Sequence, residues 1–147
     1  MTDTSIPTAR EPFGYAQLIG IKASDRLELS KKIQAGFSFS SFVILGRYMG
    51  VTDKELAALI QISTRTLNRR QKEGKLKGDE SDRLLRFARI FTYTVDLFDG
   101  DQEAAQDWLS SEIPALKGAT PLEASKTEEG AREVEGLIFG LEHGAFI

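Results

Sequence analysis

Residues 52–70, TDKELAALIQISTRTLNRR, spell two short helices joined by a tight turn, which leaves the middle of the chain little choice of fold. Thr52 and Glu55, three residues later, are spaced as a capping box. In this arrangement the Thr52 hydroxyl accepts from a free backbone N–H of the first turn, and the Glu55 carboxylate accepts from the backbone N–H of Thr52. Ser63 can cap the second helix, and Leu67 is its inward-facing anchor. The first helix has an apolar stripe made by Leu56, Ala57, Leu59 and Ile60. This pattern predicts a helix-turn-helix.

The second helix of this unit carries side chains that are suited to reading DNA. Arg can bond the O6 and N7 atoms of guanine, Asn can bond the N6 and N7 atoms of adenine, and the Thr methyl can pack on that of thymine. The N-terminal part of such a helix enters the major groove. The predicted base contacts are Thr64, Arg65, Thr66 and Asn68, and the predicted phosphate contacts, also expected to point outward, are Arg69 and Arg70. The alternative is a helical hairpin whose basic face is merely solvated.

The register of the unit is informative as well. Small, apolar, capping and apolar residues stand at Ala57, Ile62, Ser63 and Leu67. The segment therefore resembles the helix-turn-helix of phage-repressor-like (Xre/Cro) proteins, which place these residue types at the same positions. Gln61 departs from that pattern, because such units commonly carry Gly there. A turn with a positive φ at this position would put a modest strain on Gln61.

The net charge of −3 argues against a nucleic-acid binder, but the charge is distributed unevenly along the chain. Residues 63–95 hold nine Lys and Arg against four Asp and Glu, whereas residues 96–147 hold three against twelve. The basic middle can release counterions from DNA, and the acidic end would be repelled by it. We therefore expect two surfaces with different partners. The additional predicted phosphate contacts, in and before a glycine-bracketed loop, are Lys72, Lys75 and Lys77.

The segment before the helix-turn-helix is predicted to be helical after a polar start. Residues 13–21 and 24–35 are predicted helices, and Gly36 ends the second of them. Ser40 is predicted to cap a third. That third helix is unusually apolar, since it contains Phe42, Val43, Ile44, Leu45, Tyr48 and Met49. Such a helix is either a buried central helix or a dimer interface.

The segment after the helix-turn-helix is also predicted to be helical. Residues 79–98 form a long helix with an acidic first turn, which the helix dipole favours. Asp101 caps the next helix, and Thr127 caps a final one that runs from about 128 to 143. The final helix has an apolar stripe of Val134, Leu137, Ile138 and Leu141, and a second face of Gly136, Gly140 and Gly144. Close approach of another backbone is expected to compensate for these glycines, although a frayed terminal helix would look the same.

Four short motifs occur in the last third of the chain. They are A-x-x-W-L at 105–109, P-A-L-x-G-x-T-P-L-E at 114–123, T-x-x-G at 127–130 and L-x-x-x-L-x-x-G-x-x-I at 137–147. In this order they resemble the toxin-binding domain of Xre/MbcA/ParS-type antitoxins. Joined to an Xre-like helix-turn-helix, the chain is similar to antitoxins that are paired with RES-domain toxins, which attack NAD.

The resemblance implies a bacterial, cytoplasmic antitoxin that represses its own operon and neutralises its toxin through the C-terminal domain. In that family the C-terminal segment is placed at the NAD site of the toxin, and here it ends in two apolar side chains beside a carboxylate. The implied toxin contacts are Leu141, Glu142, His143, Gly144, Ala145, Phe146 and Ile147. The alternative for this segment is a disordered tail without a role.

The predicted fold is therefore all-α. Its parts are a disordered tail at 1–12, a helical N-terminal or dimerisation segment at 13–49, a helix-turn-helix DNA-binding domain at 50–98 and a small helical toxin-binding domain at 99–147. We expect a homodimer, because such motifs usually bind two half-sites roughly 34 Å apart.

Several classes of protein are disfavoured. There is no cysteine and only one histidine, and phosphate-cradling, H-E-x-x-H and G-x-S-x-G motifs are missing, so no enzyme, cofactor or metal site is predicted. No apolar run approaches the length of a membrane span. The alternative function is a stand-alone helix-turn-helix regulator whose C-terminal domain senses a ligand or oligomerises.

Overall fold

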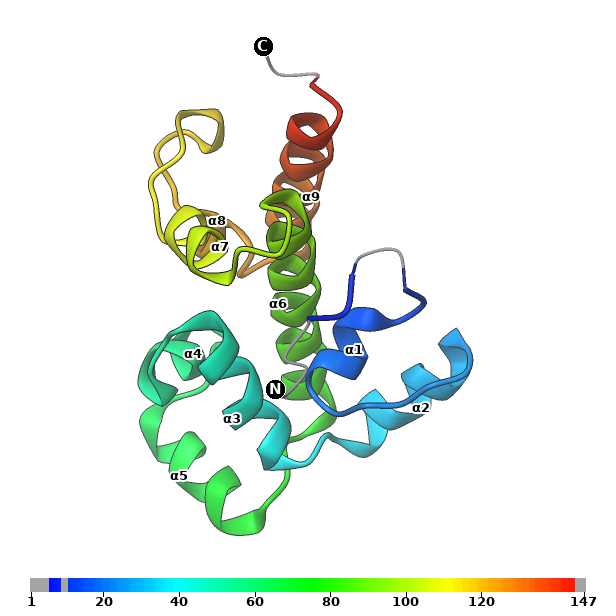
Figure 1. The fold of residues 1–147 in the computed structure, drawn as a ribbon. Coiled ribbons are helices and arrows are strands. Elements are labelled where there is room, and N and C mark those ends of the chain that lie inside the picture. The colour runs from blue at the N-terminus through cyan, green and yellow to red at the C-terminus, as the bar shows by residue number, and fades with distance from the viewer. Residues whose placement is uncertain (1–5, 9–10, 145–147) are drawn as a thin grey trace, which may run out of the picture.

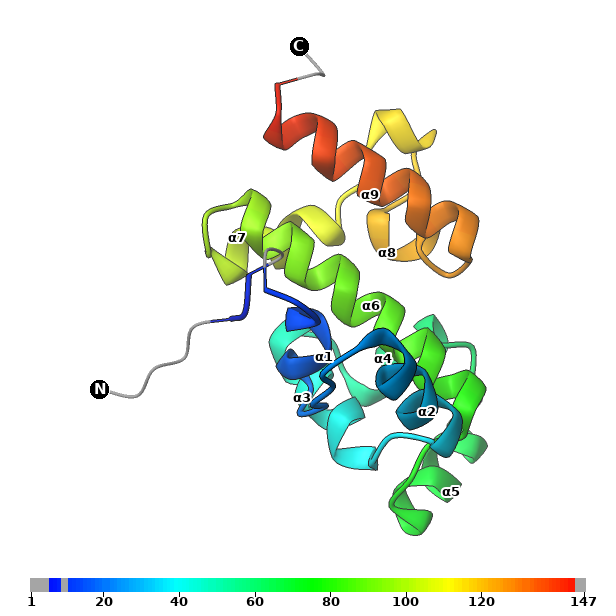
Figure 2. The same ribbon diagram turned by 90° about the vertical axis from the view of Figure 1, so that its right-hand side faces the viewer.

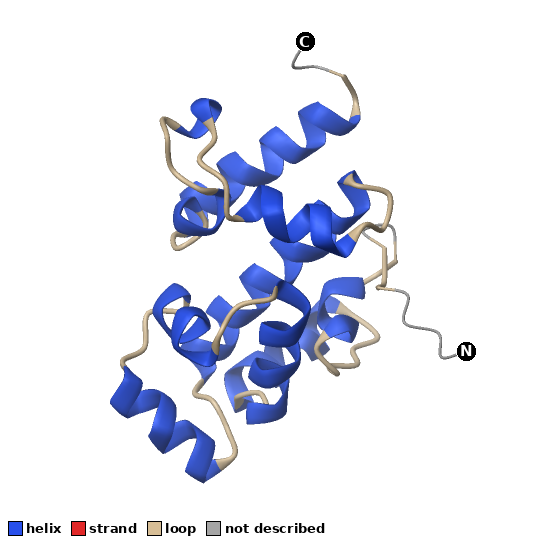
Figure 3. Cartoon of the chain, turned by 60° about the vertical axis from the view of Figure 1, so that its left-hand side comes forward, coloured by secondary structure: helices blue, strands red, loops and turns tan. Residues whose placement is uncertain are grey.

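The computed structural model describes residues 6–8 and 11–144 of the 147-residue chain. Within these residues every regular element is a helix, which confirms the predicted all-α class (Figure 3). The elements in order are α1 (Gly14–Leu18), α2 (Arg26–Ala35), α3 (Phe39–Met49), α4 (Asp53–Leu59), α5 (Thr64–Glu73), α6 (Gly78–Leu97), α7 (Gln102–Leu109), the 3-10 turn η1 (Pro114–Leu116), α8 (Pro121–Ala124) and α9 (Glu128–Glu142). No helix in the described ranges is long and apolar enough to cross a membrane.

Helix α6 passes through both halves of the molecule and organises the packing (Figures 1 and 2). Helices α1, α2 and α3 pack against it in the half that contains α4 and α5, and α7 and α9 pack against it in the other half. The predicted long helix is confirmed, and it has a broad apolar face, because Leu84, Phe87, Phe91 and Val95 are all buried in one continuous hydrophobic core. The proposed domain limits at 12, 49 and 98 remain predictions.

Four of the five predicted N-caps are confirmed. Thr52, Ser63, Asp101 and Thr127 each accept a hydrogen bond from the backbone N–H three residues later, as predicted. Ser40 is not a cap, and that prediction is wrong. Helix α3 starts earlier, because the chain before it is paired with the loop after α5 through Phe39 N–H to the Gly74 carbonyl and Leu76 N–H to the Phe37 carbonyl. The capping residue is Ser38, whose hydroxyl accepts from the Ser40 N–H at 3.2 Å.

Helix α3 is a core helix rather than a mainly exposed one. Phe42, Leu45 and Met49 are buried, and the rings of Phe39 and Phe42 stack with centroids 5.2 Å apart. The remaining apolar residues of the helix, Val43, Ile44 and Tyr48, are half-buried. Of the two predicted roles, burial is confirmed, and a dimer contact through the half-buried side remains a prediction.

The end of α9 extends beyond the core, which changes two expectations (Figure 1). Val134, Leu137 and Ile138 are buried as predicted, but Leu141 is 39% exposed, so its assignment to the buried stripe is wrong. The expected backbone approach is wrong at Gly136 and at Gly144 too, because a Cβ at either position would meet nothing within 4 Å. A close approach occurs six residues before Gly136, where a Cβ on Gly130 would overlap the carbonyl oxygen of Ala124.

Ion pairs fix α9 and the chain before it to α6. Arg89 donates to Glu135 at 2.6 Å, and Arg86 donates to the Lys126 carbonyl at 2.9 Å and to Glu128 at 3.3 Å. The carbonyl of Lys126 lies just before the start of α9, so Arg86 joins α6 to the point where the last helix begins. The C-terminal helix is thus held on α6 by polar contacts in addition to its apolar stripe.

Candidate nucleic-acid and protein interfaces

Helices α4 and α5 form the predicted helix-turn-helix, and the turn between them has a defined hydrogen-bonding pattern. The Ile62 N–H donates to the Ala57 carbonyl at 2.9 Å, and the Gln61 N–H donates to the Ala58 carbonyl at 3.1 Å. This pair of bonds is a Schellman motif, which requires a left-handed residue after the helix. Gln61 is that residue, with a φ of 62°. The turn does therefore need a positive φ at Gln61, which costs a non-glycine residue roughly 1–2 kcal/mol.

Helix α5 presents most of the predicted DNA contacts to solvent. Thr64, Arg65, Asn68 and Arg69 are exposed, Thr66 is half-buried, and Leu67 is the buried anchor that the sequence predicted. The helix lies at the edge of the molecule, away from the C-terminus (Figure 1). Its outer surface is therefore open to the major groove of a DNA duplex. The individual base contacts remain predictions.

Arg70 lies on the opposite side of α5, so its predicted outward orientation is wrong. The residue is 6% exposed, and its Nε and Nη2 atoms donate to the two carboxylate oxygens of Glu80 at 2.7 and 2.8 Å. The reason is helical spacing, because Arg70 follows Leu67 by three residues and so shares its inward face. Burial opposes ionisation of Glu80, but the bonds from Arg70 and from the Lys77 N–H outweigh it and lower the pKa of this carboxyl.

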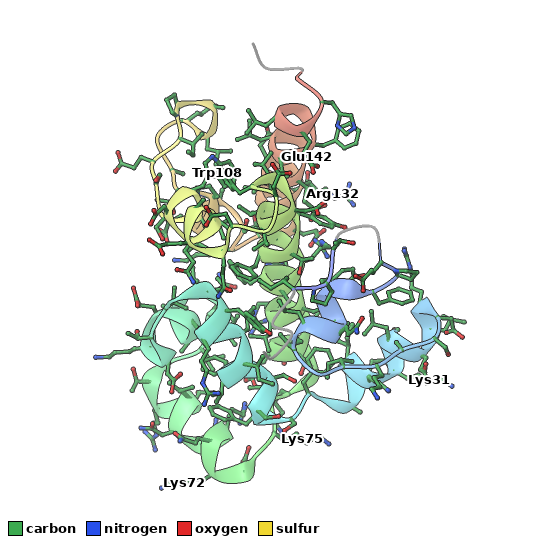
Figure 4. All side chains as sticks on the ribbon, in the orientation of Figure 1. Lys31, Lys72, Lys75, Trp108, Arg132 and Glu142 are labelled. Carbon is green, nitrogen blue, oxygen red and sulfur yellow. The ribbon has the colours of Figure 1, made fainter. Side chains whose placement is uncertain are left out.

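The three predicted lysine contacts flank this surface. Lys72, Lys75 and Lys77 are exposed, and Lys72 and Lys75 lie at the same end of the molecule as α5 (Figure 4). The loop that carries Lys75 is held by an isolated bridge to Ser38, and the Lys77 N–H donates to Glu80 at 2.9 Å. The backbone under these cations is thus fixed, and a phosphate role for them is consistent with their exposure.

The opposite end of the molecule has a different surface. Phe139 is 62% exposed, and its ring stacks on the imidazole of His143 with centroids 4.1 Å apart. The nearby implied toxin contacts that the structure describes are all exposed, namely Leu141, Glu142, His143 and Gly144. The other three, Ala145, Phe146 and Ile147, lie outside the described residues. Sequence reasoning missed Phe139, although its position off the apolar stripe of α9 was the available signal.

A shallow groove continues this surface along α9. It has a volume of about 320 Å³ between α9 and η1. Its lining residues are Ala115, Leu116, Arg132, Glu133, Gly136 and Leu137. Because Gly136 has no side chain and no neighbour at its Cβ position, a partner could approach the helix backbone closely here.

Other residues of the C-terminal motifs have mainly structural positions. Pro121 is buried, Leu122 and Trp108 are half-buried, and Thr120 caps α8 by accepting from the Glu123 N–H at 3.0 Å. Their positions therefore fit a role in packing α7 against α6 and α8 against α9. The exposed residues of α9 are the better candidates for contact with a partner.

The fold and its two surfaces define a class of protein: a DNA-binding helix-turn-helix unit followed by a helical domain that presents an apolar, partner-facing end. Comparison with protein families agrees. Residues 28–89 match the antitoxin Xre-like helix-turn-helix domain, and residues 94–144 match the antitoxin Xre/MbcA/ParS C-terminal toxin-binding domain. The chain belongs to the Xre family of antitoxins. Both matched domains are binding domains rather than enzymatic ones.

Individual relatives extend this similarity over most of the chain. Antitoxin Xre of Yersinia enterocolitica is 36% identical over 129 residues, which cover 87% of both proteins. Antitoxin Xre of Photorhabdus laumondii is 38% identical over 91 residues, which cover 61% of this chain and 62% of the relative. A protein of Sphingobium sp. named Prs ADP-ribosylating antitoxin is 27% identical over 144 residues, which cover 92% of this chain and 89% of the relative.

Proposed function

We propose that this chain is the antitoxin of a type II toxin–antitoxin pair, that it neutralises a RES-domain toxin which consumes NAD, and that it represses its own operon. The observation that carries the proposal is the exposed apolar end of α9, where Phe139 and Leu141 reach solvent within a toxin-binding domain. Large exposed apolar side chains in a cluster mark interaction sites on soluble proteins. The toxin is the partner that would cover them.

The identity of the toxin rests on two supports. The order of the two domains is similar to that of antitoxins paired with RES-domain toxins. The name of the Sphingobium relative refers to ADP-ribosylation, a reaction in which NAD is consumed. A site that binds NAD accepts an anionic, partly aromatic ligand, and residues 141–147 offer aromatic and apolar groups beside carboxylates. We therefore assign inhibition to this segment, with Phe139 as an added contact on the body of the domain.

Repression rests on the exposed face of α5 and on a dimer. A single recognition helix reads only a few base pairs, and two copies separated by one turn of DNA, roughly 34 Å, read a palindromic operator. We propose a homodimer that presents both α5 helices on one side. The acidic C-terminal domain would then lie on the side away from the DNA, where the phosphates do not repel its negative charge.

Two pairs of substitutions divide the roles on α5. Arg65→Ala with Asn68→Ala should weaken operator binding by at least about 100-fold and leave random DNA nearly unaffected, because the dimer loses four base contacts and each supplies about 1–3 kcal/mol of discrimination. Arg69→Ala with Lys72→Ala should weaken both and reduce the salt slope by about 4, since the dimer loses four phosphate contacts and each contributes about 0.9. Anisotropy titrations over a salt series measure both effects. Equal losses on the two duplexes for both pairs would contradict this division.

Co-expression tests the function as a whole. The neighbouring gene product, expressed alone, should stop growth and lower cellular NAD, and the full chain should restore both and copurify with it. If the chain rescued growth but NAD did not fall in cells that express the toxin alone, the antitoxin function would stand and an NAD-consuming toxin would be excluded. No toxicity and no complex would favour the stand-alone regulator, whose C-terminal domain would then bind something other than a toxin.

A further inference from the structure

The recognition helix is held by very little apolar packing. Of the ten residues of α5, Thr64–Glu73, only Leu67 and Arg70 are buried. A helix that is attached by one apolar side chain can pivot about it, whereas sequence readout requires side chains that are held to within about 0.5 Å and 10–20°. A second fixed point is therefore needed, and the only other buried residue of the helix is a charged one.

The first turns of α6 supply that fixed point through three polar residues, which we name the α6 clamp: Glu80, Ser81 and Arg83. Glu80 binds the guanidinium of Arg70 through two oxygens, at 2.7 and 2.8 Å, and both side chains are almost fully buried. A bidentate pair of planar groups fixes direction as well as distance. It therefore sets the rotation of α5 about its anchor, Leu67.

The other two clamp residues hold the turn between α4 and α5 and the segment before α3. Arg83 donates from Nε to the Ile60 carbonyl at 2.7 Å, at the end of α4 and directly before the left-handed Gln61. Ser81 accepts from the Phe37 N–H at 2.8 Å, in the strand-like stretch that pairs with the loop after α5. The turn that sets the angle between α4 and α5 is thus tied to the same helix as α5 itself.

We infer that Glu80 and Arg83 are positioning residues for DNA recognition: they touch no DNA, yet they determine how well the protein separates its operator from other sequences. This inference rests on the proposed DNA-reading function of α5. It assigns Arg70 to the interior of the protein and gives it a role in specificity that acts through the orientation of Arg65 and Asn68. The C-terminal surface lies at the other end of α6 and is independent of these contacts (Figure 2).

The chain provides a matched control for each residue, because Arg70 and Arg83 each have a second, exposed partner. Glu73 lies 3.4 Å from Arg70, and Asp79 lies 3.5 Å from Arg83, with carboxylate side chains 48% and 72% exposed. Because these two carboxylates are solvated, their pairs with the arginines contribute little. Glu73→Gln and Asp79→Asn therefore remove one charge each beside the same arginines and should leave DNA recognition unchanged.

The experiment uses the full chain and a duplex that the wild-type protein selects from a random pool. Glu80→Gln and Arg83→Met should each lower the ratio of selected to random affinity by about tenfold, the discrimination of one good base contact. Affinity for random DNA and neutralisation of the toxin should stay within about twofold of the wild type, since the phosphate contacts and the C-terminal surface are retained. An unchanged ratio in Glu80→Gln, or an equal fall in Glu73→Gln, overturns the inference.

A second variant separates orientation from stability. In Arg70→Met with Glu80→Leu, apolar side chains of similar volume replace the buried pair, a change that often preserves or raises stability. Glu80→Leu also removes the bond that the Lys77 N–H donates at the start of α6, so this variant should be slightly less stable than the wild type but still folded. It should still show the lowered ratio, because apolar contacts do not set direction. If this folded variant had the wild-type ratio of selected to random affinity, the Arg70–Glu80 pair would only fill space. If the wild-type chain selects no sequence at all, the proposed DNA-reading function itself fails, and that result precedes any comparison of variants.

Discussion

Removing residues 141–147 should abolish protection against the toxin and leave operator binding unchanged. The deleted segment contains Leu141, which is already exposed, and the apolar pair Phe146 and Ile147 beyond the described residues. Burial of each such side chain in a partner is worth about 1.5–3 kcal/mol, so losing all three should raise the Kd for the toxin by at least about 1000-fold. Growth of cells that co-express both proteins and a pull-down with the toxin measure this loss.

Two controls locate the effect. Leu27→Ser changes an apolar side chain that is 77% exposed on α2, in the DNA-binding half, and it should change neither growth nor complex formation. Phe139→Ala removes an exposed ring from the body of α9 and should weaken the complex by about tenfold, the lower end of the range for one side chain. Full protection by the truncated chain, combined with loss of protection in Phe139→Ala, would place inhibition on the domain body.

Gly130→Ala should lower the free energy of unfolding by about 2–3 kcal/mol, the cost of forcing a methyl group into filled space. A Cβ at this position overlaps the carbonyl oxygen of Ala124, which belongs to the short helix α8 and has little freedom to move. The stability that alanine usually adds when it replaces a glycine in a helix is therefore not gained at this position. Urea denaturation followed by circular dichroism measures the change.

Gly136→Ala is the matched control, because it makes the same chemical change in the same helix. Nothing lies within 4 Å of a Cβ at Gly136, and the residue is exposed. The substitution should therefore raise the free energy of unfolding by about 1 kcal/mol, the difference in helix propensity between Gly and Ala. If both substitutions shifted stability in the same direction, the close packing of α8 against the first turn of α9 would not be the reason for a glycine at 130.

Local rules were enough to predict the helix-turn-helix from its sequence. The caps at Thr52 and Ser63 and the turn at Gln61 all depend on hydrogen bonds between residues no more than five positions apart. Such short-range hydrogen bonds leave a recognisable spacing in the sequence. The family resemblance in the last third of the chain added the second binding surface, which no short-range rule could have supplied.

The errors have a common physical cause, because each concerns a contact between segments that are distant in the sequence. The spacing of Arg70 from Leu67 places it on the inward face, but a buried arginine needs a partner, and that partner, Glu80, lies ten residues away beyond a loop. The close backbone approach was expected at Gly136 but occurs at Gly130, because it depends on where α8 meets α9. Leu141 matches the periodicity of the buried stripe, yet the core ends one turn before it. Periodicity identifies a face, but it does not show how far the neighbouring helices extend.

Helix α6 also fixes the helical phase between the two binding surfaces. Its 20 residues, Gly78–Leu97, span about 30 Å and connect the contacts of Glu80 at one end to those of Arg89 towards the other. One residue inserted between these contacts would turn one half of the protein by about 100° relative to the other, whereas seven residues, about two turns, would nearly restore the angle. A chimera that joins this DNA-binding half to another toxin-binding half must therefore keep the length of α6 or change it only by whole turns, and it must also keep the apolar pattern of the helix.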